Sequence, residues 1–211
     1  MTYSVKEMFL TLQGEGVHAG RRAVFVRFAG CNLWTGREVD RPRAICRFCD
    51  TDFVGTDGVG GGKFVDANAL AQAVVGHWDG DAARRFVVLT GGEPMLQVDD
   101  ALVDALHAAG FTIAIESNGT IAVHPGIDWV CISPKAGSDV VQRHGDELKL
   151  VWPQAGIDPV ALEDWDFANH LIQPMDAVGQ EVANRDAAVA LAMARPRWRL
   201  SLQTHKLLGL R

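Results

Sequence analysis

The chain has 211 residues, of which 48% are hydrophobic and 22% are charged, and its formal net charge is −6. This length and composition indicate one globular domain and exclude fibrous and intrinsically disordered classes. An excess of acidic residues argues against binding along a phosphate backbone, because such binding needs clustered Lys and Arg. We therefore expect no nucleic-acid partner.

The sequence also lacks the usual signals of membranes and secretion. No apolar run approaches the roughly 20 residues that cross a bilayer, and the first residues lack the basic-then-apolar order of a signal peptide. We expect a cytoplasmic chain with no membrane partner. Four cysteines are too few for a disulfide scaffold, and a reducing compartment would keep them as thiols. The cysteines therefore need another explanation.

Predicted strands and helices alternate along the chain. In chain order, the apolar and helical patterns predict a strand at 22–28, a helix between Lys63 and Gly80 with Asp66 as its cap, a strand at 86–90, a helix at 95–109, strands at 112–116, 129–132, 147–151 and 170–173, a helix at 182–194 and a strand at 198–203. The glycine-rich residues 55–62 are expected to form a loop.

Strands that alternate with helices, without hairpin dipeptides, indicate an α/β protein with a parallel sheet. Seven predicted strands do not fit a complete eight-unit barrel. A doubly wound sheet and an incomplete barrel both remain open on this pattern alone. We find no linker that would divide the chain, so we expect a single domain over residues 1–211.

A small polar cluster follows almost every predicted strand. These clusters lie at residues 30–32, 90–93, 116–118, 133–135, 173–176 and 203–206. The carboxyl ends of parallel strands form one rim in α/β architectures, and ligands bind at that rim. The sequence therefore predicts one large polar site, although loop starts are also commonly polar.

Three of the four cysteines are candidates for a cofactor site. Cys46 and Cys49 form a C-x-x-C turn, and fourteen residues separate Cys31 from Cys46. Cys131 lies inside an apolar strand, where a cysteine usually packs as a small hydrophobe, so we assign it to the core. The trio is compatible with structural zinc, with a redox dithiol that leaves Cys31 idle, or with an iron–sulfur cluster that keeps one iron open.

The residues around the cysteines resemble those of the radical S-adenosylmethionine (SAM) superfamily. Phe48 stands between the paired cysteines, and Gly91-Gly92-Glu93-Pro94 follows the next clear strand. The resemblance implies one [4Fe–4S] cluster held by Cys31, Cys46 and Cys49, whose open iron binds SAM. The usual first interval of that superfamily is three residues, so the fourteen residues between Cys31 and Cys46 are an insertion.

Over nearly its full length the chain resembles the 7-carboxy-7-deazaguanine synthase family. The matching motifs are EMF at 7–9, TLQGEG at 11–16, FVRFAGCNL at 25–33, CRFCDT at 46–51, TGGEP at 90–94, ESNG at 116–119, SPK at 133–135 and QPMD at 173–176. Activating enzymes that make a glycyl radical on a protein partner share only the cysteine and Gly-Gly-Glu features. Activation of such a protein partner is the alternative function.

The resemblance implies a lyase that converts 6-carboxy-5,6,7,8-tetrahydropterin to 7-carboxy-7-deazaguanine and ammonia, a step in queuosine biosynthesis. It also implies an incomplete, distorted (β/α)6-type partial TIM barrel with the active site at the C-terminal ends of the strands. Family members suggest a homodimer and an electron donor such as flavodoxin or ferredoxin.

Site residues follow from the same resemblance. The implied substrate residues are Leu12, Gln13, Gly14, Glu15, Arg27 and Thr90, and Thr51 is the implied Mg²⁺ ligand. The implied SAM residues are Phe48, Cys49, Asp50, Gly92, Glu93, Glu116, Ser117, Ser133, Pro134, Lys135, Gln173, Pro174, Met175 and Asp176. The donor and acceptor edge of a pterin suits Gln13 and Glu15, and its carboxylate suits Arg27.

Overall fold

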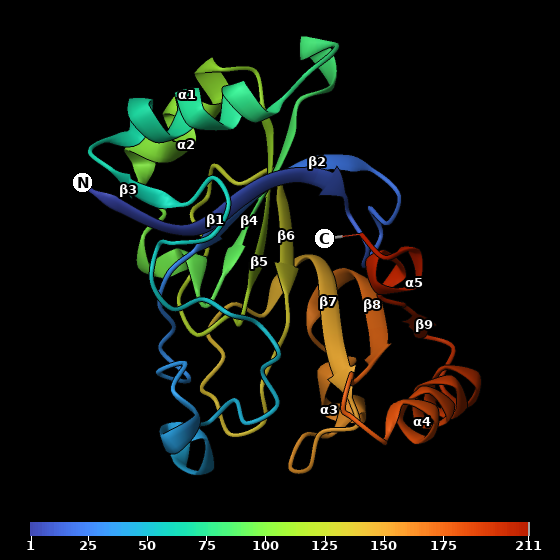
Figure 1. Ribbon diagram of the computed structural model, residues 1–211. Coiled ribbons are helices and arrows are strands. Elements are labelled where there is room, and N and C mark those ends of the chain that lie inside the picture. Colours follow the sequence, from blue (N-terminus) through green and yellow to red (C-terminus); the bar gives the residue numbers. More distant parts are fainter. Residues whose placement is uncertain (211) are drawn as a thin grey trace.

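The computed structural model describes residues 1–210, and its strands form one open nine-stranded sheet (Figure 1). The order is β3-β1-β2-β4-β5-β6-β7-β8-β9. The strands are β1 (Tyr3–Leu12), β2 (Arg22–Phe28), β3 (Gly62–Phe64), β4 (Phe86–Gly91), β5 (Thr112–Ser117), β6 (Trp129–Ile132), β7 (His144–Trp152), β8 (Asp166–Pro174) and β9 (Trp198–Leu200). From β2 to β9 all neighbouring strands are parallel, so their carboxyl ends share one rim.

The helices are α1 (Ala67–His77), α2 (Asp100–Ala108), α3 (Pro159–Leu162), α4 (Glu181–Ala194) and α5 (Thr204–Leu208). Three short 3-10 helices, η1 (Glu38–Arg43), η2 (Ala82–Arg84) and η3 (Pro94–Leu96), lie in the connections. The predicted cap of α1 is confirmed, because the carboxylate of Asp66 accepts a hydrogen bond from the backbone N–H of Ala69 at 2.8 Å.

All seven predicted strands form, but several predicted bounds are wrong. β7 begins at His144 rather than at Glu147, and β8 begins at Asp166 rather than at His170. The helix expected at 95–109 begins at Asp100, because Asp99 caps it by accepting from the N–H of Leu102 at 3.0 Å. The preceding Pro94–Leu96 forms a separate 3-10 turn. The last strand ends at Leu200 and is followed by α5, which the sequence pattern did not predict.

Strand β1 was missed, and the expectation of a purely parallel sheet is wrong at this edge. β1 pairs antiparallel with both β2 and β3. Its register shifts between Val5 and Glu7, so buried residues do not alternate regularly along it. A long loop joins β1 to β2 in place of a hairpin turn dipeptide, and the usual sequence signal is therefore absent.

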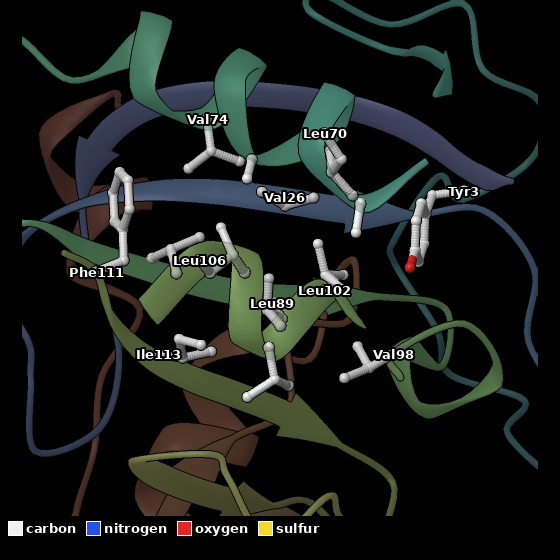
Figure 2. Packing of buried hydrophobic residues seen from close by; sticks show 14 of the residues in the cluster. Tyr3, Val26, Leu70, Val74, Leu89, Val98, Leu102, Leu106, Phe111 and Ile113 are labelled. Carbon is white, nitrogen blue, oxygen red and sulfur yellow. The ribbon is translucent and has the colours of Figure 1, made fainter. Parts of the chain in front are cut away.

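Helices α1 and α2 cover one face of the β1–β2–β4–β5 part of the sheet (Figures 1 and 2). Leu70 and Val74 of α1 and Leu102 and Leu106 of α2 are fully buried against strand residues that include Leu89. Burying each such side chain stabilises the fold by about 1.5–3 kcal/mol. This layer fixes the strands whose carboxyl ends carry the first part of the polar rim.

A second core lies over the β6–β7–β8 part of the sheet. Leu148, Leu150 and Ile172 of the strands pack with Leu162 of α3 and Ala188 of α4. This core holds the second half of the parallel strands in place. None of the helices among residues 1–210 has the length and apolar character that a bilayer-spanning segment needs.

The loop after β1 ties the two ends of the open sheet together. The N–H of Gly16 donates to Oγ of Ser201 at 3.0 Å, just after β9. The N–H of Thr204, at the start of α5, donates to the carbonyl of Gly14 at 2.8 Å. Residues that follow β1 therefore meet residues that follow β9.

Candidate functional site

One cavity of about 460 Å³ lies at the carboxyl ends of the parallel strands. Its lining comes from the loops that follow β1, β2, β4, β5, β6 and β8 and from β7 and α5. Most of the residues predicted for the site line it: Leu12, Gln13, Gly14, Glu15, Arg27, Cys31, Cys46, Phe48, Cys49, Asp50, Thr51, Thr90, Gly92, Glu116, Ser117, Ser133, Lys135, Gln173, Pro174, Met175 and Asp176. Glu93 and Pro134 do not.

The three candidate cysteines are free thiols on the wall of this cavity, whereas Cys131 is separate from them. Cys131 is buried in β6, where burial raises its pKa well above the ordinary value, and its assignment to the core is confirmed. The S–H of Cys46 donates to Cys49 and lowers the pKa of Cys49 to about 6. The site therefore presents one sulfur that ionises readily at neutral pH.

The three thiols on the cavity wall are donors that suit a metal cofactor. Among residues 1–210, no three His, Cys, Asp or Glu side chains gather closely enough to hold one metal ion. Three thiols that line one cavity, with the fourth cysteine elsewhere in the core, instead supply a three-sulfur donor set. Such a set suits an iron–sulfur cluster that keeps one position open.

Gly92 lets the loop after β4 pass directly beneath the loop that carries Cys31. A Cβ at Gly92 would lie 2.1 Å from the carbonyl oxygen of Gly30 and 2.8 Å from Cβ of Cys31, and backbone cannot yield at the first contact. The N–H of Glu93 donates to the same carbonyl at 2.9 Å. Glycine is required here for close approach, which explains its place behind the first cysteine.

Glu93 is fully buried and acts as an anchor for the loop after β5. Its carboxylate accepts from Oγ of Ser117 at 2.8 Å, from the N–H of Asn118 at 2.8 Å and from the N–H of Met95 at 3.0 Å. Burial raises the pKa of Glu93, and these hydrogen bonds oppose that rise. Its position explains why Glu93 holds cavity-lining residues without lining the cavity itself.

A buried polar network forms the floor of the cavity beneath the loop after β1. Nε2 of Gln13 donates to Glu116 at 2.8 Å, and Nζ of Lys149 lies 2.5 Å from Glu15 and 3.1 Å from Glu116. Gln203 donates to the other oxygen of Glu15 at 2.9 Å. Burial would raise the pKa of Glu15, but Lys149 outweighs it and holds that pKa at about 2. The carboxylates of Glu15 and Glu116 are therefore held in fixed positions at the cavity, where they can accept hydrogen bonds from a ligand.

Arg27 lines the cavity from β2 and already has a partner on the next strand. Its Nε lies 2.8 Å from Oε1 of Glu7, its register partner on β1. Both side chains are about one-fifth exposed, at 20% and 18%. The pair holds a cation at the cavity wall, in a position suited to an anionic group of a ligand.

Helix α5 brings two further groups to the cavity. Nζ of Lys206 bonds Asp50, at 2.9 Å, and Asp176, and so joins the cysteine loop to the end of β8. His205 also lines the cavity, and a Cβ at Gly14 would lie 2.0 Å from its Nδ1. A side chain at position 14 would clash with the ring of His205, and glycine avoids that clash.

Sequence reasoning did not single out Lys149. A signal for it was present, because a lysine in the middle of the apolar strand ELKLV must find a buried partner. Glu7 stood in the EMF motif, and Gln203 and Lys206 stood in the polar cluster at 203–206, but none of the three was given an individual role. Their bonds could not be foreseen, since their partners are distant along the chain.

The chain is similar to curated proteins over its whole length. It is 59% identical to 7-carboxy-7-deazaguanine synthase of Bradyrhizobium diazoefficiens and 60% identical to that of Caulobacter vibrioides, with 100% of both chains covered in each case. The crystal structure of QueE from Escherichia coli matches with a TM-score of 0.69 and 27% identity, covering 97% of this chain and 95% of that one. No family model matches the chain.

The curated relatives carry one name over the full length of the chain, and the QueE structure shares its fold. The cavity at the strand ends, with its three thiols and its anchored Gly-Gly-Glu-Pro loop, agrees with that assignment. The chain belongs to the 7-carboxy-7-deazaguanine synthase family.

Proposed function

We propose that this protein is a radical SAM lyase that converts 6-carboxy-5,6,7,8-tetrahydropterin to 7-carboxy-7-deazaguanine and ammonia. The observation that carries the proposal is the single cavity, which joins the three thiols at one wall to the Lys149 network at its floor. The names of the full-length relatives support the same product. In the proposed reaction a hydrogen atom is taken from C6 of the pterin, the ring contracts with loss of ammonia, and the hydrogen atom is returned, because the substrate contains the same atoms as the product plus ammonia.

Cys31, Cys46 and Cys49 would hold one [4Fe–4S] cluster. Bound there together with SAM, the cluster would supply the electron for the reductive cleavage of SAM. The residues proposed to bind SAM are Phe48, Cys49, Asp50, Gly92, Glu116, Ser117, Ser133, Pro134, Lys135, Gln173, Pro174, Met175 and Asp176. Nζ of Lys135 is already bonded to the carbonyl and hydroxyl of Ser133, at 2.7 and 2.6 Å. Glu93 contributes by positioning Ser117, since its carboxylate holds the hydroxyl of that residue.

The pterin would lie over the polar floor. Its N–H groups suit the oxygens of Glu15, which Lys149 keeps ionised, and the amide of Gln13, while Arg27 meets its carboxylate. Leu12, Gly14 and Thr90 complete the lining on this side. These residues bind and orient the substrate, and the radical chemistry belongs to the bound cofactors.

Mg²⁺ is part of the proposal, with Thr51 as its protein ligand. Mg²⁺ prefers six oxygen ligands, keeps several waters and borrows oxygens from substrates. Thr51 lines the cavity between Asp50 and Asp52, which makes this wall rich in oxygen. One hydroxyl suffices if the substrate carboxylate and water supply the other ligands.

The remaining parts of the proposal concern architecture and context. We propose that the six longer parallel strands form an incomplete, distorted (β/α)6 barrel. The bond between the loop after β1 and Ser201, just after β9, supports this part of the proposal. The whole of residues 1–211 would form a single radical SAM core domain that works as a homodimer in the cytoplasm. Flavodoxin or ferredoxin would donate the electron.

Anaerobic reconstitution tests the function directly. The protein is loaded with iron and sulfide, then incubated with SAM, a reductant and carboxytetrahydropterin, and 5′-deoxyadenosine and the deazaguanine product are measured. Cys31→Ala should lose the cluster and both products, whereas the matched control Cys131→Ala should keep them, because Cys131 packs in the core. Production of 5′-deoxyadenosine without any deazaguanine would refute the proposed substrate.

The alternative, an activating enzyme for a glycyl radical on a protein partner, is not favoured. The full-length relatives carry the name of the deazaguanine enzyme. The polar floor of the cavity also suits a small ligand rich in hydrogen-bond donors.

A further inference from the structure

The insertion between Cys31 and Cys46 contains the short helix η1, and the proposed function does not explain it. No residue of η1 is buried, and its first residue has no side-chain cap. Hydrophobic packing of its own side chains therefore does not hold this segment in place. Its main side-chain contact with the rest of the site runs through Arg41.

The guanidinium of Arg41 reaches from η1 to the C-x-x-C turn. Its Nη1 donates to the carbonyl oxygens of Arg47 and Cys49 at 2.8 and 3.0 Å. One carbonyl directly precedes Phe48, and the other belongs to Cys49, the second cysteine of the turn. One rigid group therefore contacts the backbone on both sides of Phe48, in the turn that carries two of the proposed cluster ligands.

Arg41 is itself held on two other sides. Its Nε and Nη2 form a fork with the carboxylate of Glu38 at 2.7 and 2.6 Å, and its Cζ lies 4.0 Å from the ring centroid of Trp34. Trp34 is buried, and its ring packs edge-on against that of Phe53 at 5.6 Å. The guanidinium thus has one conformation fixed by a carboxylate, an aromatic face and two carbonyls.

We propose that Arg41 is a positioning residue for the iron–sulfur cluster, and that the insertion serves to carry it. It holds the Cys46–Cys49 turn in the geometry in which both sulfurs point at the cavity. This inference rests on the proposed function, because it assumes that the turn binds a cluster. Residues of this outer layer around metal sites typically change metal affinity by about 10- to 100-fold when they are replaced.

The test compares cluster retention in three variants of the full chain. After anaerobic reconstitution, iron and sulfide per chain are measured, together with the rate at which a chelator removes iron and the EPR spectrum of the reduced cluster with and without SAM. Arg41→Met should lose iron to the chelator about 10-fold faster than the unmodified protein and show an altered spectrum. Arg43→Met is the control, because Arg43 is exposed in the same helix.

Arg41→Lys separates shape from charge. It keeps the cation but lacks the fork that spans two carbonyls and a carboxylate, so it should retain iron poorly as well. Recovery of normal retention in Arg41→Lys would show that charge alone is needed and would overturn the positioning role. Equal retention in Arg41→Met and the unmodified protein would overturn it too.

Circular dichroism and thermal unfolding of the iron-free proteins exclude general unfolding as the cause, since η1 packs no core residue. If Arg41→Met unfolds in the iron-free state while Arg43→Met does not, Arg41 is a structural residue and the inference fails. If the unmodified protein binds no cluster at all, the proposed function fails first. The two failures are therefore distinguishable.

Discussion

Lys149 and Glu15 form an ion pair at the floor of the cavity, with Nζ of Lys149 2.5 Å from Oε2 of Glu15. Only 4% of the Lys149 side chain is exposed, and its Nζ also lies 3.1 Å from Glu116. One ammonium group therefore balances two carboxylates that are largely shielded from water. The pair holds the carboxylates in place as hydrogen-bond acceptors for a ligand rich in donors. Removing a partner of the pair should lower the stability of the protein.

Replacing Lys149 by Met leaves Glu15 and Glu116 without their cation. Removing one partner of a buried pair typically costs about 3–5 kcal/mol, because the remaining charge is uncompensated. We expect the free energy of unfolding of Lys149→Met to fall by about that amount in urea denaturation. The control is Lys63→Met, on the exposed face of β3, which should change it by less than about 0.5 kcal/mol. Similar losses in both variants would contradict the ion-pair account.

The pH dependence of that loss has a defined sign. In the folded protein Lys149 holds the pKa of Glu15 at about 2, below its ordinary value of 4.5. This carboxylate therefore stabilises the protein above pH 4.5, and the contribution is lost as the pH falls from 4.5 toward 2. In Lys149→Met only the hydrogen bonds from Gln203 and Gln173 still oppose the effect of burial, so the pKa of Glu15 rises.

As the pH falls, Glu15 becomes protonated in Lys149→Met, and the uncompensated buried charge disappears. The stability gap between the unmodified protein and Lys149→Met should be largest at neutral pH and should narrow as the pH approaches 4. Urea denaturation of both proteins at several pH values between 7 and 4 measures the gap. A gap that stays constant over this range would show that Glu15 is not the group left charged.

Glu93 offers a second test of buried anchoring. Glu93→Ala leaves buried donors of Ser117, Asn118 and Met95 without their acceptor, and each unsatisfied group costs about 1–3 kcal/mol. Glu93→Gln keeps one amide oxygen as an acceptor and should lose less. Thermal unfolding of the two variants compares them. An unchanged unfolding temperature in Glu93→Ala would mean that the carboxylate does not hold the loop after β5.

The proposed Mg²⁺ ligand is tested by pairing two substitutions. Thr51→Ala removes the hydroxyl, whereas Thr51→Ser keeps it. We expect turnover to rise with added Mg²⁺ in the unmodified protein and in Thr51→Ser, and to fall in Thr51→Ala. Initial rates over a Mg²⁺ titration measure this. Rates that respond neither to Mg²⁺ nor to Thr51→Ala would remove the metal from the mechanism.

The sequence predicted the parallel part of the sheet well because its strands carry strong local signals. Phe86–Gly91 is almost fully buried and reads as a continuous apolar run, and Trp129–Ile132 has the predicted bounds. Strand β1 lacks such a signal, since its register shifts and its partner β2 lies beyond a long loop. Pairing with a distant strand, more than local preference, makes this segment a strand.

The same distinction applies to the cavity. Cys31, Cys46, Cys49 and Gly92 stand in motifs whose residue types and spacing are enough to indicate their chemistry. Lys206 stands in the polar cluster at 203–206, but its partners Asp50 and Asp176 are 156 and 30 positions away and meet it only through the fold. Motifs therefore located the cofactor wall of the cavity, and the fold was needed to show the ion pairs that support it.

Arg27 provides the test of substrate recognition. Arg27→Gln removes the cation that we propose meets the pterin carboxylate, and a hydrogen bond to a charged group contributes about 1.5–3 kcal/mol. We expect KM for the pterin to rise by roughly 10- to 100-fold, since 1.4 kcal/mol is a factor of ten. Arg27→Lys keeps the charge but loses the planar fork, so its KM should lie between those of the unmodified protein and Arg27→Gln.

Iron per chain and the apparent affinity for SAM should stay unchanged in both Arg27 variants, because Arg27 bonds Glu7 on β1 rather than the cysteine loop. Measuring iron and SAM binding beside KM separates lost recognition from a damaged cofactor site. If Arg27→Gln leaves KM unaltered, the carboxylate of the substrate does not bind at β2. The anionic group would then have to meet another cation on the cavity wall, and Lys206 and Lys135 are the candidates there.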